Sequence, residues 1–242
     1  MPDRPRALAA VLAFGLAVRV AAALCVWDAP PVLDETEFTR IAASLARGAG
    51  YSLDGVAPTV RRPPLYPAFL APFAAGFERP WPAARLAQAA LDTATCLLLY
   101  LFSLAALGDP RGALAAAALC AASPVFAAYS ATLLSEPLFF FVWTGSLLLL
   151  TRVIERADRP WLRAGTAGAA LCLAIECRPT VILFPAFACG LLALARPFDR
   201  GRAVRLGGVV LAAYLGLAPW AARNKAVAGK PVPVATGGGA SF

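Results

Sequence analysis

The residues best suited to chemistry lie in one polar stretch of an otherwise apolar chain, Leu33–Pro67, with the sequence LDETEFTRIAASLARGAGYSLDGVAPTVRRPPLYP. This stretch opens on an acidic pair, Asp34 and Glu35, and closes on an Arg-Arg-Pro-Pro corner. A carboxylate held at the rim of a cavity can take the proton of an attacking hydroxyl, which is general-base catalysis. Asp34 is our candidate for such a base.

Asp34 also has a structural explanation that needs no catalysis. Asp34 followed three residues later by Glu37 is the pattern of a capping box, in which side chains satisfy free amides at a helix start. Apolar residues then recur at Phe38, Ile41, Ala42 and Leu45. This spacing predicts an amphipathic helix lying in the plane of the membrane. The two interpretations of Asp34 are compatible, because a capped helix start holds a carboxylate rigidly.

Arg61 and Arg62 form the basic end of the stretch. The two prolines that follow favour an extended corner, which would present both guanidinium groups together. Guanidinium suits phosphate because of its bidentate geometry and weak hydration. The pair is therefore a candidate contact to a substrate phosphate. Anchoring of the loop to anionic lipid explains the same two residues equally well.

Composition places the chain in a membrane. Of its 242 residues 60% are hydrophobic and only 15% are charged, which is outside the range of soluble proteins. The net charge of +8 is carried by basic residues in short loops between apolar runs. This pattern is typical of membrane topology rather than of a nucleic-acid surface, so we expect no nucleic-acid partner.

Residue types that the chain lacks exclude several chemistries. It has no histidine, which rules out Ser-His-Asp and Cys-His catalysis and histidine-ligated zinc. Its six cysteines have no Cys-x-x-Cys spacing, and most lie in apolar runs where Cys packs as a small hydrophobe. We expect free thiols, with a bridge between Cys25 and Cys177 as the alternative, and neither a metal ion nor a cofactor.

Hydropathy predicts an all-α fold, a polytopic transmembrane bundle of about seven spans. The predicted spans are residues 7–27, 82–107, 112–131, 134–151, 161–177, 179–195 and 206–222. Arginines gather in three segments, residues 4–6, 152–163 and 196–205. Seven crossings from a cytoplasmic N-terminus place all three segments in the cytoplasm, as the positive-inside rule requires.

This topology gathers unusual polar residues on the outer face. They include the first outer loop, residues 28–81, and Glu136 at the mouth of the fourth span. Glu176 and Arg178 are two residues apart at a tight turn, so we expect a local ion pair. Arg223 ends the last span on the outer face, against the positive-inside trend, which a compensating anionic group or a misplaced span boundary would explain.

Two ionisable residues lie deep in the predicted spans. Arg19 in the first span and Asp92 in the second are both roughly 12–15 Å from the outer end of their helix at 1.5 Å per residue. Equal depth predicts a buried ion pair with a structural role rather than a catalytic one.

Several runs of residues, in this order, carry a family resemblance. They are DETEF, IAASLARGAGYS, RRPPLYP, ARLAQAAL, YSATLLSEPLF, RPT and PWAARNKAVAGKPVPVATGGG. Together they resemble the polytopic GT-C glycosyltransferases, and more narrowly the bacterial branch related to protein O-mannosyltransferases and the aminoarabinose transferase of lipid A. The resemblance covers nearly all of the chain and implies one GT-C-like transmembrane domain over residues 1–242, as the N-terminal portion of a longer protein.

The resemblance also implies an activity and its residues. Family members transfer a sugar from a polyprenyl-phosphate-linked donor to a lipid, glycan or protein acceptor, at the outer face of the bacterial inner membrane. Asp34 is implied as the base, with Glu35 beside it to orient the acceptor, and direct attack would invert the sugar carbon. The implied substrate-binding residues are Arg61, Arg62, Tyr66, Glu136, Arg223 and Asn224. The remaining partners are membrane lipids.

Two other functions remain open from the residues alone. One is a transporter or flippase of an anionic lipid-linked substrate, for which charges near the midplane of broken spans would be diagnostic. The other is a non-catalytic membrane subunit, in which the acidic pair only caps a helix.

Overall fold

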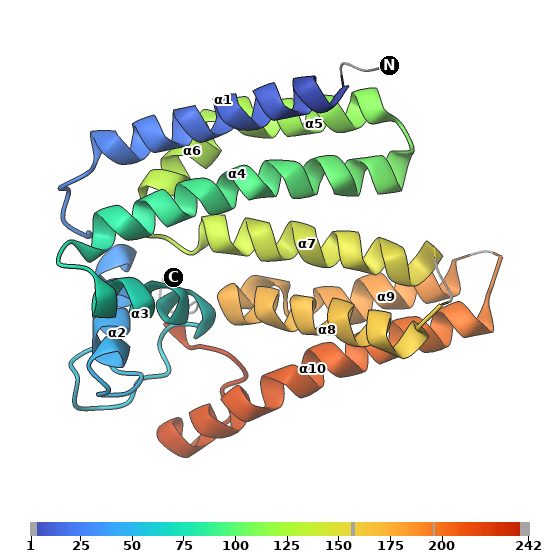
Figure 1. Ribbon diagram of the computed structural model, residues 1–242. Coiled ribbons are helices and arrows are strands. Elements are labelled where there is room, and N and C mark those ends of the chain that lie inside the picture. Colours follow the sequence, from blue (N-terminus) through green and yellow to red (C-terminus); the bar gives the residue numbers. More distant parts are fainter. Residues whose placement is uncertain (1–3, 156–157, 196, 238–242) are drawn as a thin grey trace. The chain divides into compact units, whose positions relative to one another are not determined.

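The computed structural model describes residues 4–155, 158–195 and 197–237. Over these residues the regular secondary structure is helical, apart from one isolated β-bridge between Ser52 and Pro58, so the all-α prediction is confirmed (Figure 1). The helices are α1 (Arg4–Cys25), α2 (Asp34–Ala46), α3 (Leu65–Gly76), α4 (Pro80–Leu107), α5 (Pro110–Ala122), α6 (Pro124–Ala131), α7 (Glu136–Glu155), α8 (Pro160–Cys177), α9 (Phe184–Leu194), α10 (Arg200–Ala228) and the 3-10 helix η1 (Pro179–Val181).

Four helices in the described part of the chain are long and apolar enough to cross a membrane, namely α1, α4, α7 and α10. Helices α5 and α6 make a fifth candidate if they are taken as one span bent by 52° at Ser123 and Pro124. The chain is therefore a multi-pass membrane protein. The prediction of seven spans is wrong.

The two predicted spans that fail are residues 161–177 and 179–195. The first corresponds to α8, which has 18 residues but includes Arg163, Glu176 and many small residues of low hydropathy. The second corresponds to η1 and α9, and α9 has only 11 residues. At 1.5 Å per residue α9 reaches about 16 Å, roughly half of the hydrocarbon thickness. Both segments are helical as predicted, but neither meets the requirements of a span by itself.

The residue types at the ends of α4 and at the start of α5 explain where these helices begin and end. Helix α4 begins at Pro80, whose missing N–H costs nothing in a first turn, and it ends at Leu107, before Gly108 with its left-handed φ of 67°. Asp109 then caps α5, because its carboxylate accepts hydrogen bonds from the backbone N–H groups of Arg111 and Gly112 at 2.9 Å each.

The chain divides into two compact units. Unit 1 comprises residues 1–59 and 66–144, and unit 2 comprises residues 60–65 and 145–242. The boundaries cut through the polar stretch that contains the candidate chemistry. Its acidic end, with Asp34, belongs to unit 1, whereas Arg61 and Arg62 belong to unit 2.

Unit 1 is built around a buried ion pair. Helix α1 packs along α4, α5 and α6, as Figure 1 shows. Between them Arg19, fully buried, donates from Nε to Oδ2 of Asp92 at 2.6 Å. The remaining guanidinium nitrogens donate to the backbone carbonyl oxygens of Gly15, Cys120 and Ala121 at 3.0–3.1 Å. The predicted Arg19–Asp92 pair is confirmed.

Unit 2 is built by close helix packing. Helices α8 and α9 both pack against α10. At the α8–α10 crossing, a Cβ on Gly168 would lie 2.5 Å from Cβ of Ala212 and 2.6 Å from the carbonyl oxygen of Val209. A Cβ on Gly216 would lie 2.7 Å from Sγ of Cys172. Small residues are thus required here, as is common where helices approach closely in lipid.

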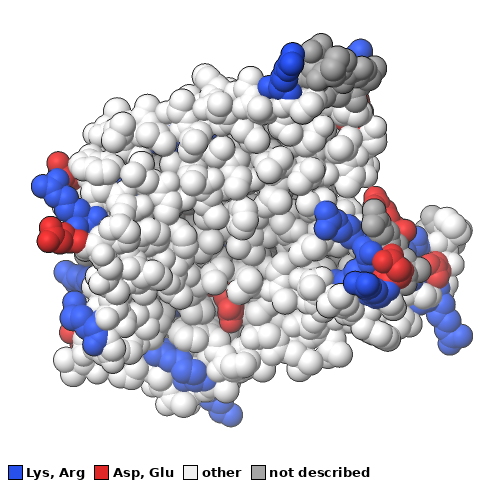
Figure 2. Space-filling model, in the orientation of Figure 1, with Lys and Arg blue, Asp and Glu red and all other residues white. Residues whose placement is uncertain are grey.

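The surface and the thiols agree with a membrane protein. On the face shown in Figure 2, charged side chains lie mainly near helix ends, and the helix surface between them carries few charges. All six cysteines are free, so the alternative of a Cys25–Cys177 bridge is excluded.

Candidate active site

The acidic corner, which we define as Asp34, Glu35 and Glu136, is assembled within unit 1. Asp34 begins α2 and its side chain is exposed, whereas Glu35 is only 6% exposed. The residue before the helix is Leu33, which has an unfavourable left-handed φ of 47° and no capping side-chain bond. The predicted capping box of Asp34 and Glu37 is therefore wrong.

Glu35, rather than Asp34 and Glu37, makes the side-chain hydrogen bond to a backbone amide at the start of α2. Its Oε2 accepts a hydrogen bond from the backbone N–H of Val32 at 3.1 Å, which fixes the chain that enters α2. Its Oε1 accepts from the backbone N–H of Leu133 at 3.0 Å, three residues before Glu136. One buried carboxylate thus joins the start of α2 to the segment that leads into α7. Glu35 positions Asp34, and its own oxygens are already occupied.

Tyr66 belongs to the same support. It is fully buried, and its hydroxyl donates to Oε1 of Gln88. Gln88 in turn donates from Nε2 to the carbonyl oxygens of Ser130 and Thr132, at 3.3 and 2.6 Å. The ring of Tyr66 packs edge-on against Phe38 of α2 at 5.0 Å between centroids. Its phenol is thus committed to protein contacts, which indicates a positioning role.

Helix α2 is amphipathic as predicted, but its apolar face is covered by protein. Phe38 is 5% exposed, and Ile41 and Ala42 are fully buried. Other residues of the protein cover all three side chains. Ser44 on the same helix is also buried, and its hydroxyl donates to the carbonyl oxygen of Gly50 at 2.9 Å. The apolar face of α2 therefore contacts protein rather than lipid, and the position of this helix in the plane of the membrane stays a prediction.

Arg85 fixes the chain between α1 and α2. It is 1% exposed, and it was not predicted as functional. Its Nη1 donates to the carbonyl oxygens of Val26 and Trp27 at 2.9 and 3.2 Å, and its Nη2 donates to that of Ala29 at 2.9 Å. These bonds fix residues 26–29, in the segment that leads from α1 to Asp34.

A tight turn lies in the loop between the acidic and basic residues. Hydrogen bonds from the backbone N–H groups of Val56 and Ala57, and from the hydroxyl of Ser52, lower the pKa of Asp54 from 3.8 to about 2. The carboxylate accepts each backbone bond at 2.9 Å. Because the folded pKa is depressed, this turn is fully stabilised above pH 4 and loses that contribution as the pH falls towards 2.

The basic corner, which we define as Arg61, Arg62 and Arg223, is assembled within unit 2. The backbone N–H of Thr236 donates to the carbonyl oxygen of Val60 at 3.0 Å, and that of Gly237 donates to Arg61 at 2.8 Å. A Cβ on Gly237 would lie 2.5 Å from the same Arg61 oxygen, so only glycine permits this approach. Arg61 is exposed and Arg62 is partly buried.

Asn224 connects this segment to α10. It is fully buried, and its Nδ2 donates to the carbonyl oxygens of Val232 and Val234 at 3.3 and 2.8 Å. Trp220 donates from Nε1 to Val234 at 2.8 Å, and the guanidinium of Arg223 lies 4.9 Å from the centre of its ring. Asn224 was predicted to bind substrate, but these bonds give it a supporting place beneath Arg223.

The predicted local pair of Glu176 and Arg178 is not formed. In the described part of the chain Glu176 makes no ion pair, because α8 ends at Cys177 and Arg178 leaves in an extended conformation with φ of −140°. Over the same described residues, no three Cys, Asp or Glu side chains lie together in a way that could hold a metal ion.

The fold and its charged corners define a class, a multi-pass membrane protein with polar loops at helix ends, and a comparison with known families narrows it. Residues 61–222 match the family described as dolichyl-phosphate-mannose-protein mannosyltransferase. Since this is more than half of the chain, the protein belongs to that family of membrane glycosyltransferases, whose donor is a lipid-phosphate-linked sugar. No curated protein and no solved structure matches the chain.

The match covers only part of the candidate site. It includes Arg61, Arg62, Tyr66 and Glu136, and it also includes Arg85 and Gln88. Asp34, Glu35, Arg223 and Asn224 lie outside the matched residues.

Proposed function

We propose that the protein transfers a sugar from a polyprenyl-phosphate-linked donor to a hydroxyl of a lipid, glycan or protein acceptor, with Asp34 as the general base. The observation that carries this proposal is the environment of Asp34. An exposed carboxylate at the start of α2 is held by a buried neighbour, Glu35, whose oxygens are used entirely for backbone contacts. A base must be accessible and rigid, and Asp34 is both.

The proposed reaction is a direct displacement. The acceptor oxygen attacks the anomeric carbon, the bond between that carbon and the phosphate oxygen breaks, and the hydroxyl proton passes to the Asp34 carboxylate. The products are the inverted glycoside and a polyprenyl phosphate that carries one more negative charge. Phosphate is a good leaving group, so stabilisation of its charge matters more than protonation.

Arg61 and Arg62 are the proposed phosphate contacts. Their backbone is fixed by the two bonds from Thr236 and Gly237, and guanidinium groups bind phosphate oxygens in pairs. Arg223 on α10 adds a third positive charge to the same unit. Glu136 is proposed as a further polar contact to substrate, because it begins α7 beside the segment that Glu35 anchors.

We infer that the reaction takes place at the outer face of a bacterial inner membrane, with the N-terminus in the cytoplasm. The revised number of spans leaves this side unchanged. With α5 and α6 taken as one bent span, the five candidate spans place residues 4–6, 152–163 and 196–205 on the same side, because four spans precede residues 152–163 and α8 and α9 are not spans. The positive-inside rule then assigns that side to the cytoplasm.

The test replaces Asp34 with Asn in the full chain. Membranes that contain the protein are supplied with radiolabelled polyprenyl-phosphate mannose, and the label transferred to endogenous acceptors is measured. We expect Asp34→Asn to lower the rate by about 10²–10⁴-fold, the usual contribution of a general base. Asp28→Asn is the matched control, since Asp28 is an exposed carboxylate in the same outer loop. Transfer near the wild-type rate at equal abundance of Asp34→Asn would exclude Asp34 as the base.

A further inference from the structure

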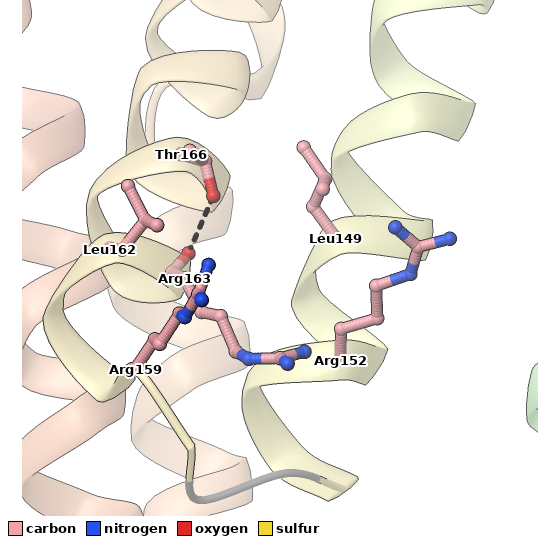
Figure 3. Close-up of a pocket in the computed structure, with 6 residues that line it drawn as sticks. All are labelled: Leu149, Arg152, Arg159, Leu162, Arg163 and Thr166. Atoms are coloured by element: carbon pink, nitrogen blue, oxygen red, sulfur yellow. Dashed lines mark hydrogen bonds between the residues drawn. The ribbon is translucent and has the colours of Figure 1, made fainter.

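A separate charged cavity lies within unit 2, between the end of α7 and the start of α8. It has a volume of about 260 Å³ and is lined by Leu149, Arg152, Arg159, Leu162, Arg163 and Thr166 (Figure 3). Among the described residues no carboxylate lines it. We call it the arginine pocket.

The charge of the arginine pocket is only partly balanced. Arg163 donates from Nη2 to Oδ2 of Asp158 at 2.5 Å and from Nε to the Asp158 carbonyl oxygen at 2.8 Å, so these two side chains nearly neutralise each other. Within the described chain neither Arg152 nor Arg159 makes an ion pair. About two positive charges therefore remain among the described lining residues, an excess that favours an anionic ligand such as a phosphodiester, which carries one negative charge.

The backbone presents these arginines to the cavity at a conformational cost. Arg159 precedes Pro160 with φ of 48° and ψ of 52°, a left-handed conformation that is unfavourable for any residue with a side chain. Such conformations often occur at functional sites. In Figure 3 Arg159 and Arg163 extend from the start of α8, and Arg163 reaches towards α7. The Arg152 guanidinium points away from α8 in this view, and rotation about its side-chain bonds would bring it towards the cavity.

The surroundings place the pocket at the edge of a membrane. Arg152 lies in the last turn of α7, a candidate span, at the opposite end of that helix from Glu136. Trp161 and Leu162 at the start of α8 are 65% and 60% exposed. An exposed tryptophan beside basic residues at the end of a span is typical of the headgroup level of a bilayer.

We propose that the arginine pocket binds the phosphate group of an anionic phospholipid headgroup. Guanidinium groups provide paired donors for the phosphate oxygens, and Leu149 and Leu162 provide an apolar wall for the acyl chains that a lipid brings with it. This site is independent of the sugar donor, because it lies at the other end of α7 from Glu136.

The test compares lipids on the purified full chain in detergent micelles. Phosphatidylglycerol and, separately, phosphatidylcholine are titrated, and binding is followed by the rise in Tm. We expect phosphatidylglycerol to bind and phosphatidylcholine to have little effect. In R152Q/R159Q the affinity for phosphatidylglycerol should fall about 25-fold, since each basic residue near a lipid surface contributes about 1 kcal/mol, or about fivefold. The single variants should each lose about fivefold.

The matched control is R111Q/R200Q, which removes two exposed arginines outside the pocket. We expect it to bind phosphatidylglycerol like the wild type. An equal loss in this control, or equal binding of phosphatidylcholine, would overturn the proposal. Inorganic phosphate is titrated in the same way to distinguish a lipid from a soluble anion. Stabilisation by phosphate with the same affinity, lost in R152Q/R159Q, would replace the lipid by a soluble phosphate.

Discussion

In unit 1 the acidic corner is held by buried side chains, whereas in unit 2 the basic corner is held by backbone hydrogen bonds and glycine. Glu35, Arg85 and Gln88 each bind several backbone groups from within unit 1. In unit 2 the Arg61 carbonyl oxygen accepts from Gly237, and α8 and α10 meet at Gly168.

The difference has a physical reason. A general base must keep its position. A buried charged side chain that satisfies several backbone groups fixes its neighbours strongly, because loss of its hydrogen bonds would leave those buried groups unpaired. An arginine that contacts phosphate has a long and flexible side chain, so it is sufficient to fix the backbone of that residue. Unit 1 should therefore be sensitive to loss of polar atoms, and unit 2 to addition of carbon atoms.

The largest effect is expected from Arg19→Ala in unit 1. This change leaves the Asp92 carboxylate buried without its partner, which should destabilise the protein by about 3–5 kcal/mol. The amount of folded protein in detergent should fall sharply. Asp92→Ala in the same background should add little further loss, because the charge is then removed together with its partner. A strictly additive loss would contradict a coupled pair.

In unit 2 the corresponding change is Gly168→Val. The new Cβ would meet the Val209 carbonyl oxygen at 2.6 Å, so α8 and α10 must move apart, which should cost about 3 kcal/mol. Thermal unfolding in detergent measures this loss. Gly165→Val on the same helix has no atom within 4 Å of the new Cβ and is the control. Equal Tm values for the two variants would show that the crossing is not close.

Glu35→Gln tests whether Glu35 positions or catalyses. Gln can accept only one of the two backbone bonds, so the loss of a bond to a charged acceptor should lower stability by about 2 kcal/mol. Activity should fall together with Tm. Glu78→Gln, at an exposed carboxylate of the same outer loop, should change neither. Lost activity at an unchanged Tm would instead identify Glu35 as a catalytic residue.

The smallest effect is expected from Gly237→Ala in unit 2. The added methyl group would push the chain away from the Arg61 carbonyl oxygen, which lies 2.5 Å from the Cβ position. We expect the KM for the sugar donor to rise about tenfold, equivalent to about 1.4 kcal/mol, with little change in kcat or Tm. Gly190→Ala, in an open position on α9, should leave KM unchanged. A changed kcat with a normal KM would contradict the proposed role of the basic corner.

Periodicity and equal depth were sufficient to predict the helices and the Arg19–Asp92 pair, because both follow from spacing along one chain. The predicted number of spans is wrong because of α8 and α9, where hydropathy alone does not distinguish a span from a short packed helix. A buried polar stripe on α4, which consists of Arg85, Gln88 and Asp92, was not predicted. Their spacing of three and four residues could have revealed it, and all three are at most 1% exposed.

The capping box failed for a different reason. Glu37 and Asp34 have the right spacing, but Glu35 reaches Leu133, which lies 98 positions away in the chain. Tyr66 and Asn224 stand in family-like runs, and only their burial shows that their polar atoms are already used. Spacing reports partners within the same helix, whereas Glu35 and Tyr66 reach residues 98 and 22 positions away, and Asn224 reaches beyond the end of its helix to Val232 and Val234.

The bend between α5 and α6 connects Pro124 with the Arg19–Asp92 pair, a connection that spacing along the chain did not predict. Pro124 has no N–H, so it cannot satisfy the carbonyl oxygen of Cys120 in the usual helical manner, and Arg19 donates to that oxygen and to Ala121 instead. Arg19 therefore acts as a helix cap supplied by another helix, and a broken helix is tolerated in lipid because its freed backbone groups are satisfied. In evolution or redesign, Pro124, Arg19 and Asp92 should change as a set.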